Sequence, residues 1–223
     1  LDALSNLAIA FNEIGEFEES AKCCKEGLKL SIGNKSLYQN FAYLLLSQGE
    51  LKSALEAFKV IAKTNKTDAD IFYAIASIYQ DLGELKLAII NYKVALQLRE
   101  DFPEALCNLG LSIHENGDPN EALTYYNKAT SKRQSYLEVI NNIGLAMKDT
   151  GRIEESLKYY SKALKINPDY PESITNLGVA YLYQGNYIDG WPKYQKRYEA
   201  SKDRVSLIVN PSGERIYDLD FNK

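Results

Sequence analysis

Six glycines recur at a constant interval of 34 residues along this chain of 223 residues, and no insertion interrupts the interval. A fixed period of this length is typical of stacked repeats, in which each unit buries its apolar face against its neighbours. The interval predicts six repeats followed by a non-repeating tail, residues 205–223. The glycines are Gly15, Gly49, Gly83, Gly117, Gly151 and Gly185, and the repeats are 1–34, 35–68, 69–102, 103–136, 137–170 and 171–204.

Each repeat has the pattern of two helices, helix A before the glycine and helix B after it. Counted from the first residue of each repeat, positions 4, 7, 8 and 11 are apolar or small, and this spacing places them on one face of a helix. Small residues on both sides of the glycine would let the two helices approach closely. They are Ala8, Ala42, Ala76, Gly110, Gly144 and Gly178 at position 8, and Ser20, Ala54, Ala88, Ala122, Ser156 and Gly190 at position 20. The sequence therefore predicts an all-α solenoid of helix-turn-helix repeats.

Two further positions predict the core. Position 7 is apolar throughout, and position 24 is aromatic in five of the six repeats. Much of the chain's high tyrosine content, 17 residues, is thereby explained as packing rather than cofactor binding. Position 7 holds Leu7, Phe41, Ile75, Leu109, Ile143 and Leu177, and position 24 holds Cys24, Phe58, Tyr92, Tyr126, Tyr160 and Tyr194.

Helix starts are marked by an acidic residue followed by proline. Asp118 is expected to cap a helix B whose first residue is Pro119, and Asp101 and Asp169 are expected to mark helix A starts in the same way. In the sixth repeat, Asp189 is expected to cap a helix B that starts late, which would place Pro192 in its first turn. Trp191 would then cover the end of the stack, so the sixth repeat is interpreted as a C-terminal cap.

The segment "NNIGLAMKDTGRIEESLKYYSKALKINPDY", residues 141–170, resembles a tetratricopeptide repeat (TPR). The small, Gly or Ala, aromatic, Ala and Pro positions of that family match Gly144, Ser156, Tyr160, Ala163 and Pro168. The resemblance extends over residues 1–204. It implies a right-handed superhelix with helix A on the concave face, and a cytoplasmic scaffold for protein–protein interaction.

Composition argues against several other functions. The net charge is −4 and the pI is about 5.3, so no basic surface points to nucleic acid, and no apolar run is long enough to span a membrane. His114 is the only histidine, and no residues at metal-ligand spacing accompany it. Neither a cofactor nor a metal is expected, and no catalytic residue can be assigned. Cys24, in the core column, is expected to be buried.

Asparagine at position 6 of helix A is the feature that most needs a functional explanation, because asparagine is only a middling helix former. Position 6 lies beside the core stripe, and stacking would align the amides so that they could bind the backbone of an extended peptide. Tyr43 and Tyr73 could add contacts. The alternative is that the asparagines bridge adjacent repeats or face solvent. The predicted peptide-binding residues are Asn6, Asn40, Asn108, Asn142 and Asn176, with Ala74 as a gap.

Three functions remain open at this stage. The first is a scaffold that binds an extended peptide of a partner protein. The second rests on "GWPKYQKRY" and "NPSGERIYDLDFNK", residues 190–198 and 210–223, which resemble the last repeat and linker before a glycosyltransferase-like domain of the O-linked N-acetylglucosamine transferase kind. The segment would then be the substrate-recruiting arm of an enzyme whose catalytic domain lies beyond residue 223. The third is self-association through the repeat ends. Binding of a C-terminal carboxylate is excluded, because positions 2 and 5 lack the required cations.

Overall fold

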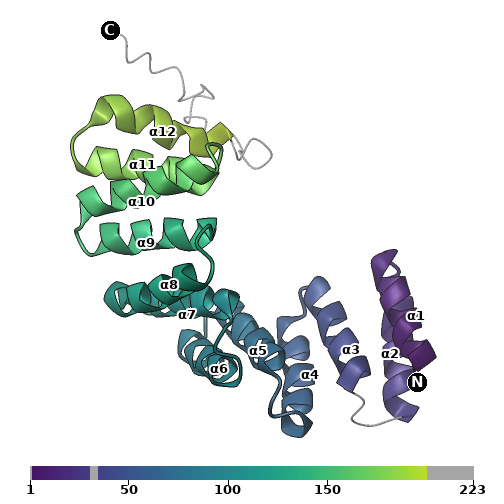
Figure 1. The fold of residues 1–223 in the computed structure, drawn as a ribbon. Coiled ribbons are helices and arrows are strands. Elements are labelled where there is room, and N and C mark those ends of the chain that lie inside the picture. The colour runs from purple at the N-terminus through teal and green to yellow at the C-terminus, as the bar shows by residue number, and fades with distance from the viewer. Residues whose placement is uncertain (1, 31–34, 200–223) are drawn as a thin grey trace. The chain divides into compact units, whose positions relative to one another are not determined.

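Twelve α-helices in consecutive antiparallel pairs make up the computed structural model, which describes residues 2–30 and 35–199 (Figure 1). This all-α arrangement confirms the predicted fold class. The chain divides into two compact units, residues 1–134 with α1 to α8 and residues 135–223 with α9 to α12. The helices are α1 Asp2–Glu13, α2 Phe17–Leu30, α3 Lys35–Ser47, α4 Leu51–Thr64, α5 Ala69–Asp81, α6 Leu85–Leu98, α7 Pro103–Glu115, α8 Pro119–Lys132, α9 Leu137–Asp149, α10 Ile153–Ile166, α11 Pro171–Tyr183 and α12 Tyr187–Glu199.

Every helix pair turns at one of the periodic glycines, and all six glycines have positive φ angles between 75° and 99°. The residue after each glycine donates its backbone N–H to the carbonyl five residues earlier, for example Glu84 to Tyr79 and Arg152 to Met147, each at 2.8 Å. This bond together with a left-handed glycine is the Schellman motif, which satisfies carbonyls that the helix end would otherwise leave without partners. The 34-residue glycine period therefore reflects one identical helix stop in each repeat.

The small residues at positions 8 and 20 let the two helices of a pair pack closely, as predicted, and all of them are buried. In the first pair the Ser20 hydroxyl donates to the backbone carbonyl of Ala8 at 2.7 Å. A Cβ atom added to Gly144 would lie 2.6 Å from ring atom Cε1 of Tyr160. On Gly178 it would lie 2.6 Å from the backbone nitrogen of Tyr194. Helix A therefore approaches helix B to the limit that side-chain volume allows.

The core columns are confirmed, with one exception at the N-terminal end. At position 24 the side chains from Cys24 to Tyr160 are fully buried, and Tyr194 in the last repeat is half-buried. At position 7 the prediction is wrong for Leu7, which is exposed. In the second and sixth repeats the position 7 side chains, Phe41 and Leu177, pack against core residues of the preceding repeat in the same unit.

Helix starts differ from the predictions in two places. Asp118 caps α8 as expected, because its Oδ1 accepts the N–H of Glu121 at 2.8 Å and Pro119 is the first helical residue. The prediction is wrong for Asp101 and Asp169. Proline does begin α7 and α11, but the capping positions are held by Phe102 and Tyr170, and neither makes a side-chain cap hydrogen bond.

The predicted late start of α12 is also wrong, because the helix begins at Tyr187 and Pro192 lies inside it. Asn186 is the true cap: its Oδ1 accepts the backbone N–H of Asp189 at 3.3 Å, and its Nδ2 donates to Asp189 Oδ2 at 2.8 Å, so the two side chains hold each other at the helix start. Trp191 is 47% exposed and its ring packs edge-on against Tyr194 of the same helix. Its end-covering role remains a prediction, and the tail 205–223 lies outside the described residues.

We expect Gly178→Ala to lower the free energy of unfolding by about 1–3 kcal/mol, because its new Cβ meets backbone atoms of α12 that cannot move without shifting the helix. Gly144→Ala is the matched control. The three atoms nearest to its Cβ belong to the ring of Tyr160, a side chain, and none belongs to the backbone of the partner helix. Chemical denaturation of both variants measures the difference, and equal losses would show that the close approach in the last pair is not a backbone contact.

We expect Gly151→Ala to cost about 1–2 kcal/mol for a different reason. A Cβ there meets no atom within 4 Å, so the cost comes only from placing an alanine at the left-handed φ of 79°. Gly151→Asn should cost less, because asparagine tolerates the left-handed region better than alanine. Thermal unfolding of the two variants tests this order, and a loss from alanine no larger than that from asparagine would contradict it.

Candidate functional site

The A helices lie on the inner side of each unit. The backbones of α1 and α3, of α5 and α7, and of α9 and α11 come close to each other, whereas those of α3 and α5 do not. Within the described part of each unit, no two successive B helices approach in this way. Helices that pack more closely on one side of a stack lie inside its curve. The position 6 asparagines belong to these A helices. A peptide bound on the inner side of a unit would therefore contact the helices that carry them.

Asn108 connects the third and fourth repeats. Its Nδ2 donates to the hydroxyl of Tyr73 at 2.9 Å, across the contact between α7 and α5. The ring of Tyr73 is held in turn by Tyr92 and Phe102, with ring centroids 5.7 and 4.9 Å away. Both Asn108 and Tyr73 are half-buried. Two of the predicted peptide-binding residues are thus joined in one bridge between repeats.

Asn176 makes the corresponding bridge in the second unit. Its Nδ2 donates to Asn141 Oδ1 at 3.1 Å, and the buried Ser173 hydroxyl donates to the same oxygen at 3.0 Å. Asn141 and its neighbour Asn142 are both buried in α9. Asn141 therefore accepts two hydrogen bonds from α11, which fixes the register of the last two repeats.

The other predicted residues have different surroundings. Asn6 is exposed, Asn40 is half-buried, and Ala74, the gap in the series, is buried. Tyr43 is 45% exposed, and its ring packs edge-on against Phe58 with centroids 5.4 Å apart. Part of the Tyr43 ring is therefore available to another molecule, while its packing against Phe58 limits its motion.

Both bridges join a position 6 asparagine to the position 5 residue of the preceding repeat, 35 residues earlier. The sequence analysis considered bridging as an alternative but did not identify these partners. The available signal was the polar character of position 5, where Tyr73 and Asn141 can accept a hydrogen bond. Pairing the two columns would have predicted both bridges.

The acidic residues near the helix A starts have partners that the sequence analysis also missed. Asp70 Oδ1 accepts from Arg99 Nη1 at 3.0 Å, and Glu104 Oε1 accepts from Arg133 Nη1 at 3.4 Å. Each arginine directly follows the helix B of the same repeat. These pairs are exposed, so each contributes little to stability. They do account for two of the acidic residues without invoking a binding stripe.

The described residues offer little for catalysis. Cys23, Cys24 and Cys107 are buried free thiols, and burial raises the pKa of Cys24 to about 11, so its thiolate is scarce at neutral pH. Within residues 2–30 and 35–199, no three His, Cys, Asp or Glu side chains gather in a way that could hold a metal ion. Among the helices that the structure describes, none is both long and apolar enough to cross a bilayer.

Two family models match parts of the chain. A model described as TPR repeat matches residues 76–117 and 144–185, and a model described as tetratricopeptide repeat matches residues 103–132. These models describe repeat units and no catalytic domain. No curated protein matches the chain.

Solved structures of similar fold cover most of the chain. The crystal structure of MamA is 23% identical, with a TM-score of 0.70, covering 75% of this chain and 91% of that one. YrrB, described as a TPR protein with an unusual peptide-binding site, is 22% identical, with a TM-score of 0.64 and coverage of 82% and 95%. A tetratricopeptide repeat protein from Parabacteroides merdae is 18% identical, with a TM-score of 0.81 and coverage of 89% and 78%. TPR family models thus match parts of the chain, and the chain has the fold of a TPR solenoid.

Proposed function

We propose that the chain is a protein-interaction scaffold whose A helices bind an extended peptide segment of a partner protein through the position 6 asparagines. Each unit offers a stretch of this surface. The first unit carries Asn6, Asn40 and Asn108 with Tyr43 and Tyr73, and the second carries Asn142 and Asn176. No cofactor, metal or nucleic acid takes part in this proposal.

The bridging bonds of Asn108 and Asn176 are the observation that carries the proposal. A primary amide has two N–H donors and an oxygen acceptor, and each bridge uses one N–H. The bond fixes the side chain. The Asn108 amide also interacts with the Tyr92 hydroxyl, so Asn108 offers mainly its oxygen to a peptide N–H, whereas Asn176 offers both its second N–H and its oxygen. An amide held in place before binding loses less conformational entropy when a ligand arrives. Bridging therefore supports recognition rather than competing with it.

Similarity to solved structures adds support of a general kind. One protein of the same fold, YrrB, is described as having a peptide-binding site. At 22% identity this shows the fold alone, so the binding residues of the present chain rest on its own geometry. The cytoplasmic location stays a prediction.

A second candidate function is self-association through the repeat ends, because large apolar side chains are exposed at both. The first repeat exposes Leu7, Ile14 and Phe17, and the sixth exposes Ile188 and Trp191. Exposed apolar groups that gather at one place favour association. Sedimentation at several concentrations would detect it. The glycosyltransferase-arm alternative rests partly on residues 210–223, outside the described part of the chain, and stays a prediction.

We expect the triple variant Asn108→Ala, Asn142→Ala, Asn176→Ala to lose about tenfold or more in affinity for peptide, because each hydrogen bond contributes about 0.5–1.5 kcal/mol. A library of short uncharged synthetic peptides supplies the ligand, and titration calorimetry measures its binding to parent and variant. Circular dichroism checks that the variant folds. We expect it to fold, because the third repeat already has alanine, Ala74, at position 6.

Tyr73→Phe is the matched control, because it removes the acceptor of one bridge and keeps both the Asn108 amide and the ring packing. If the asparagines serve only as bridges, Tyr73→Phe and Asn108→Ala will lose similar stability and neither will change peptide affinity. That result would overturn the proposal. A loss of affinity in Asn108→Ala that exceeds the loss in Tyr73→Phe supports it, because Tyr73→Phe keeps the amide but no longer holds it in place.

A further inference from the structure

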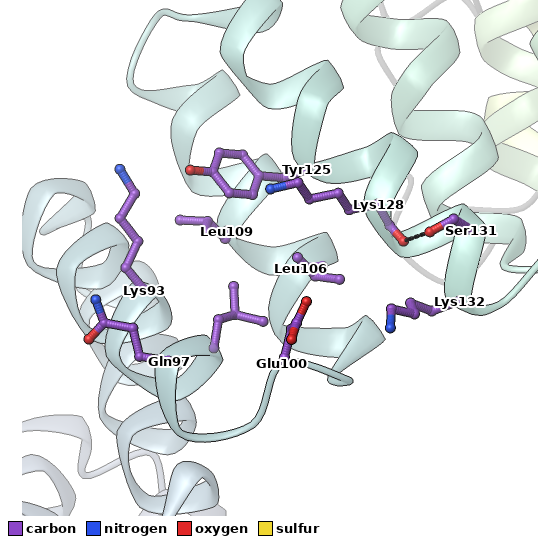
Figure 2. Close-up of a pocket in the computed structure, with 10 residues that line it drawn as sticks. Lys93, Gln97, Glu100, Leu106, Leu109, Tyr125, Lys128, Ser131 and Lys132 are labelled. Atoms are coloured by element: carbon purple, nitrogen blue, oxygen red, sulfur yellow. Dashed lines mark hydrogen bonds between the residues drawn. The ribbon is translucent and has the colours of Figure 1, made fainter.

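A hollow of about 420 Å³ lies on the B-helix side of the first unit, between α6 and α8 and above α7 (Figure 2). Its floor is formed by Leu106 and Leu109 of α7, both buried, and Leu96 of α6 lines it as well. The position 6 asparagines do not line it. It is therefore a second surface, separate from the face proposed above to bind an extended peptide.

Lysines surround this apolar floor. Figure 2 shows Lys93 and Gln97 on one side of the hollow and Lys128 and Lys132 on the other, with Leu106 and Leu109 between them. The ammonium group of Lys128 lies 5.4 Å from the ring centroid of Tyr125, a second aromatic wall. The rim therefore presents positive charge directly above an apolar surface.

The acidic neighbours of these lysines hold them only loosely. Lys93 Nζ is 3.6 Å from Glu121 Oε1, and Lys132 Nζ is 3.7 Å from Asp101 Oδ1. All four side chains are at least 40% exposed. Exposed pairs at such distances have little net energy, so a carboxylate on a ligand can replace them at small cost.

The same hollow recurs one repeat earlier, between α4 and α6 above α5, with a volume of about 540 Å³. Its floor contains Phe72 and Ile75, and Lys59, Lys63 and Lys66 surround it. Seven lining residues correspond at an interval of 34 residues, so the repeat itself builds the hollow and its floor. The pairs are Lys59 and Lys93, Ala62 and Leu96, Lys63 and Gln97, Lys66 and Glu100, Phe72 and Leu106, Ile75 and Leu109, and Asn91 and Tyr125. Only Lys59 and Lys93 correspond as lysines, and the other lysines of each rim come from different positions of the repeat.

Lysines outnumber carboxylates among the residues that line both hollows, although Glu121 and Asp101 lie beside the rim of the first and Glu56 pairs with Lys59 at 2.8 Å in the second. Each hollow is lined by three lysines and one glutamate, Glu100 in one and Glu56 in the other, whereas the whole chain has a net charge of −4. Against a negative background, a repeated positive rim selects ligands of negative charge and raises their association rate. The apolar floor also requires the ligand to have an apolar side chain that can be buried there. An inorganic anion has none.

We propose that these two B-side hollows are docking sites for an acidic segment of a partner protein that alternates carboxylates with apolar side chains. Each hollow takes one apolar side chain on its floor, while neighbouring carboxylates pair with the lysines of its rim. Because the two hollows share one arrangement of helices and an apolar floor, a single longer segment can occupy both. The proposal is independent of the asparagine face, and variants of the two surfaces distinguish them.

The test uses the whole chain and a short synthetic peptide in which aspartates alternate with leucines. We expect Lys93→Glu with Lys128→Glu to weaken binding about tenfold or more, measured by titration calorimetry, because like charges then face each other at the rim. Lys86→Glu with Lys158→Glu is the matched control: both side chains are exposed, neither lines a hollow, and the change in net charge is the same. The control variant should bind the peptide with an affinity within about threefold of the parent, because salt screens charges that lie far from the binding site.

Peptide variants test the two halves of the recognition. Replacing the leucines of the peptide by alanine should weaken binding, because less apolar surface is buried on the floor of the hollow. Replacing the aspartates by lysine should abolish binding, because the peptide charges then repel the lysines of the rim. Backbone NMR shifts on titration should cluster at 59–75 and 93–132. The proposal is wrong if the parent does not bind the peptide, if the rim variant binds no worse than the control, or if the shifts cluster instead at the position 6 asparagines.

Discussion

The left-handed glycine between the two helices of each pair is the constraint on which the rest of the structure depends. It ends helix A at one residue and satisfies its last carbonyls through a bond five residues back. Helix B then starts at a fixed place relative to helix A. The small residues at positions 8 and 20 consequently meet at the same height in every pair. Had the stop varied by one residue, a helix face would have rotated by about 100° and the columns would have lost their common environment.

Because the register is the same in every repeat, residues at one repeat position lie on the same side of successive repeats. On the A side, position 6 meets position 5 of the preceding repeat, as in the bridges from Asn108 to Tyr73 and from Asn176 to Asn141. On the B side, two successive repeats of the first unit build the same hollow with lysines around an apolar floor. One repeat geometry therefore carries two chemically different surfaces. We propose that the A surface binds peptide backbone and that the B surface binds acidic side chains.

The sequence predicted those parts of the fold that depend on residues within one repeat. The glycine turns, the close-packed small positions and the buried aromatic column followed from spacing alone. Position 7 failed only at Leu7, where burial depends on a preceding repeat. The start of α12 was wrong because Asn186 caps the helix with its side chain held by Asp189, and pattern reasoning favoured an early place in the helix for Pro192. Bridging by the asparagines was considered, but their partners and the hollows were missed, because both join side chains of different repeats, which a reading of each repeat alone does not compare.

The most direct test of the central claim is an NMR titration that follows the side-chain amide signals of the position 6 asparagines. The ligand is an uncharged Ser- and Ala-rich peptide, compared with the same peptide methylated on its backbone nitrogens. If these amides hold peptide backbone, the signals of Asn108 and Asn176 will shift with the unmodified peptide and much less with the methylated one. Equal shifts with both peptides, or none with either while backbone signals elsewhere move, would contradict the account.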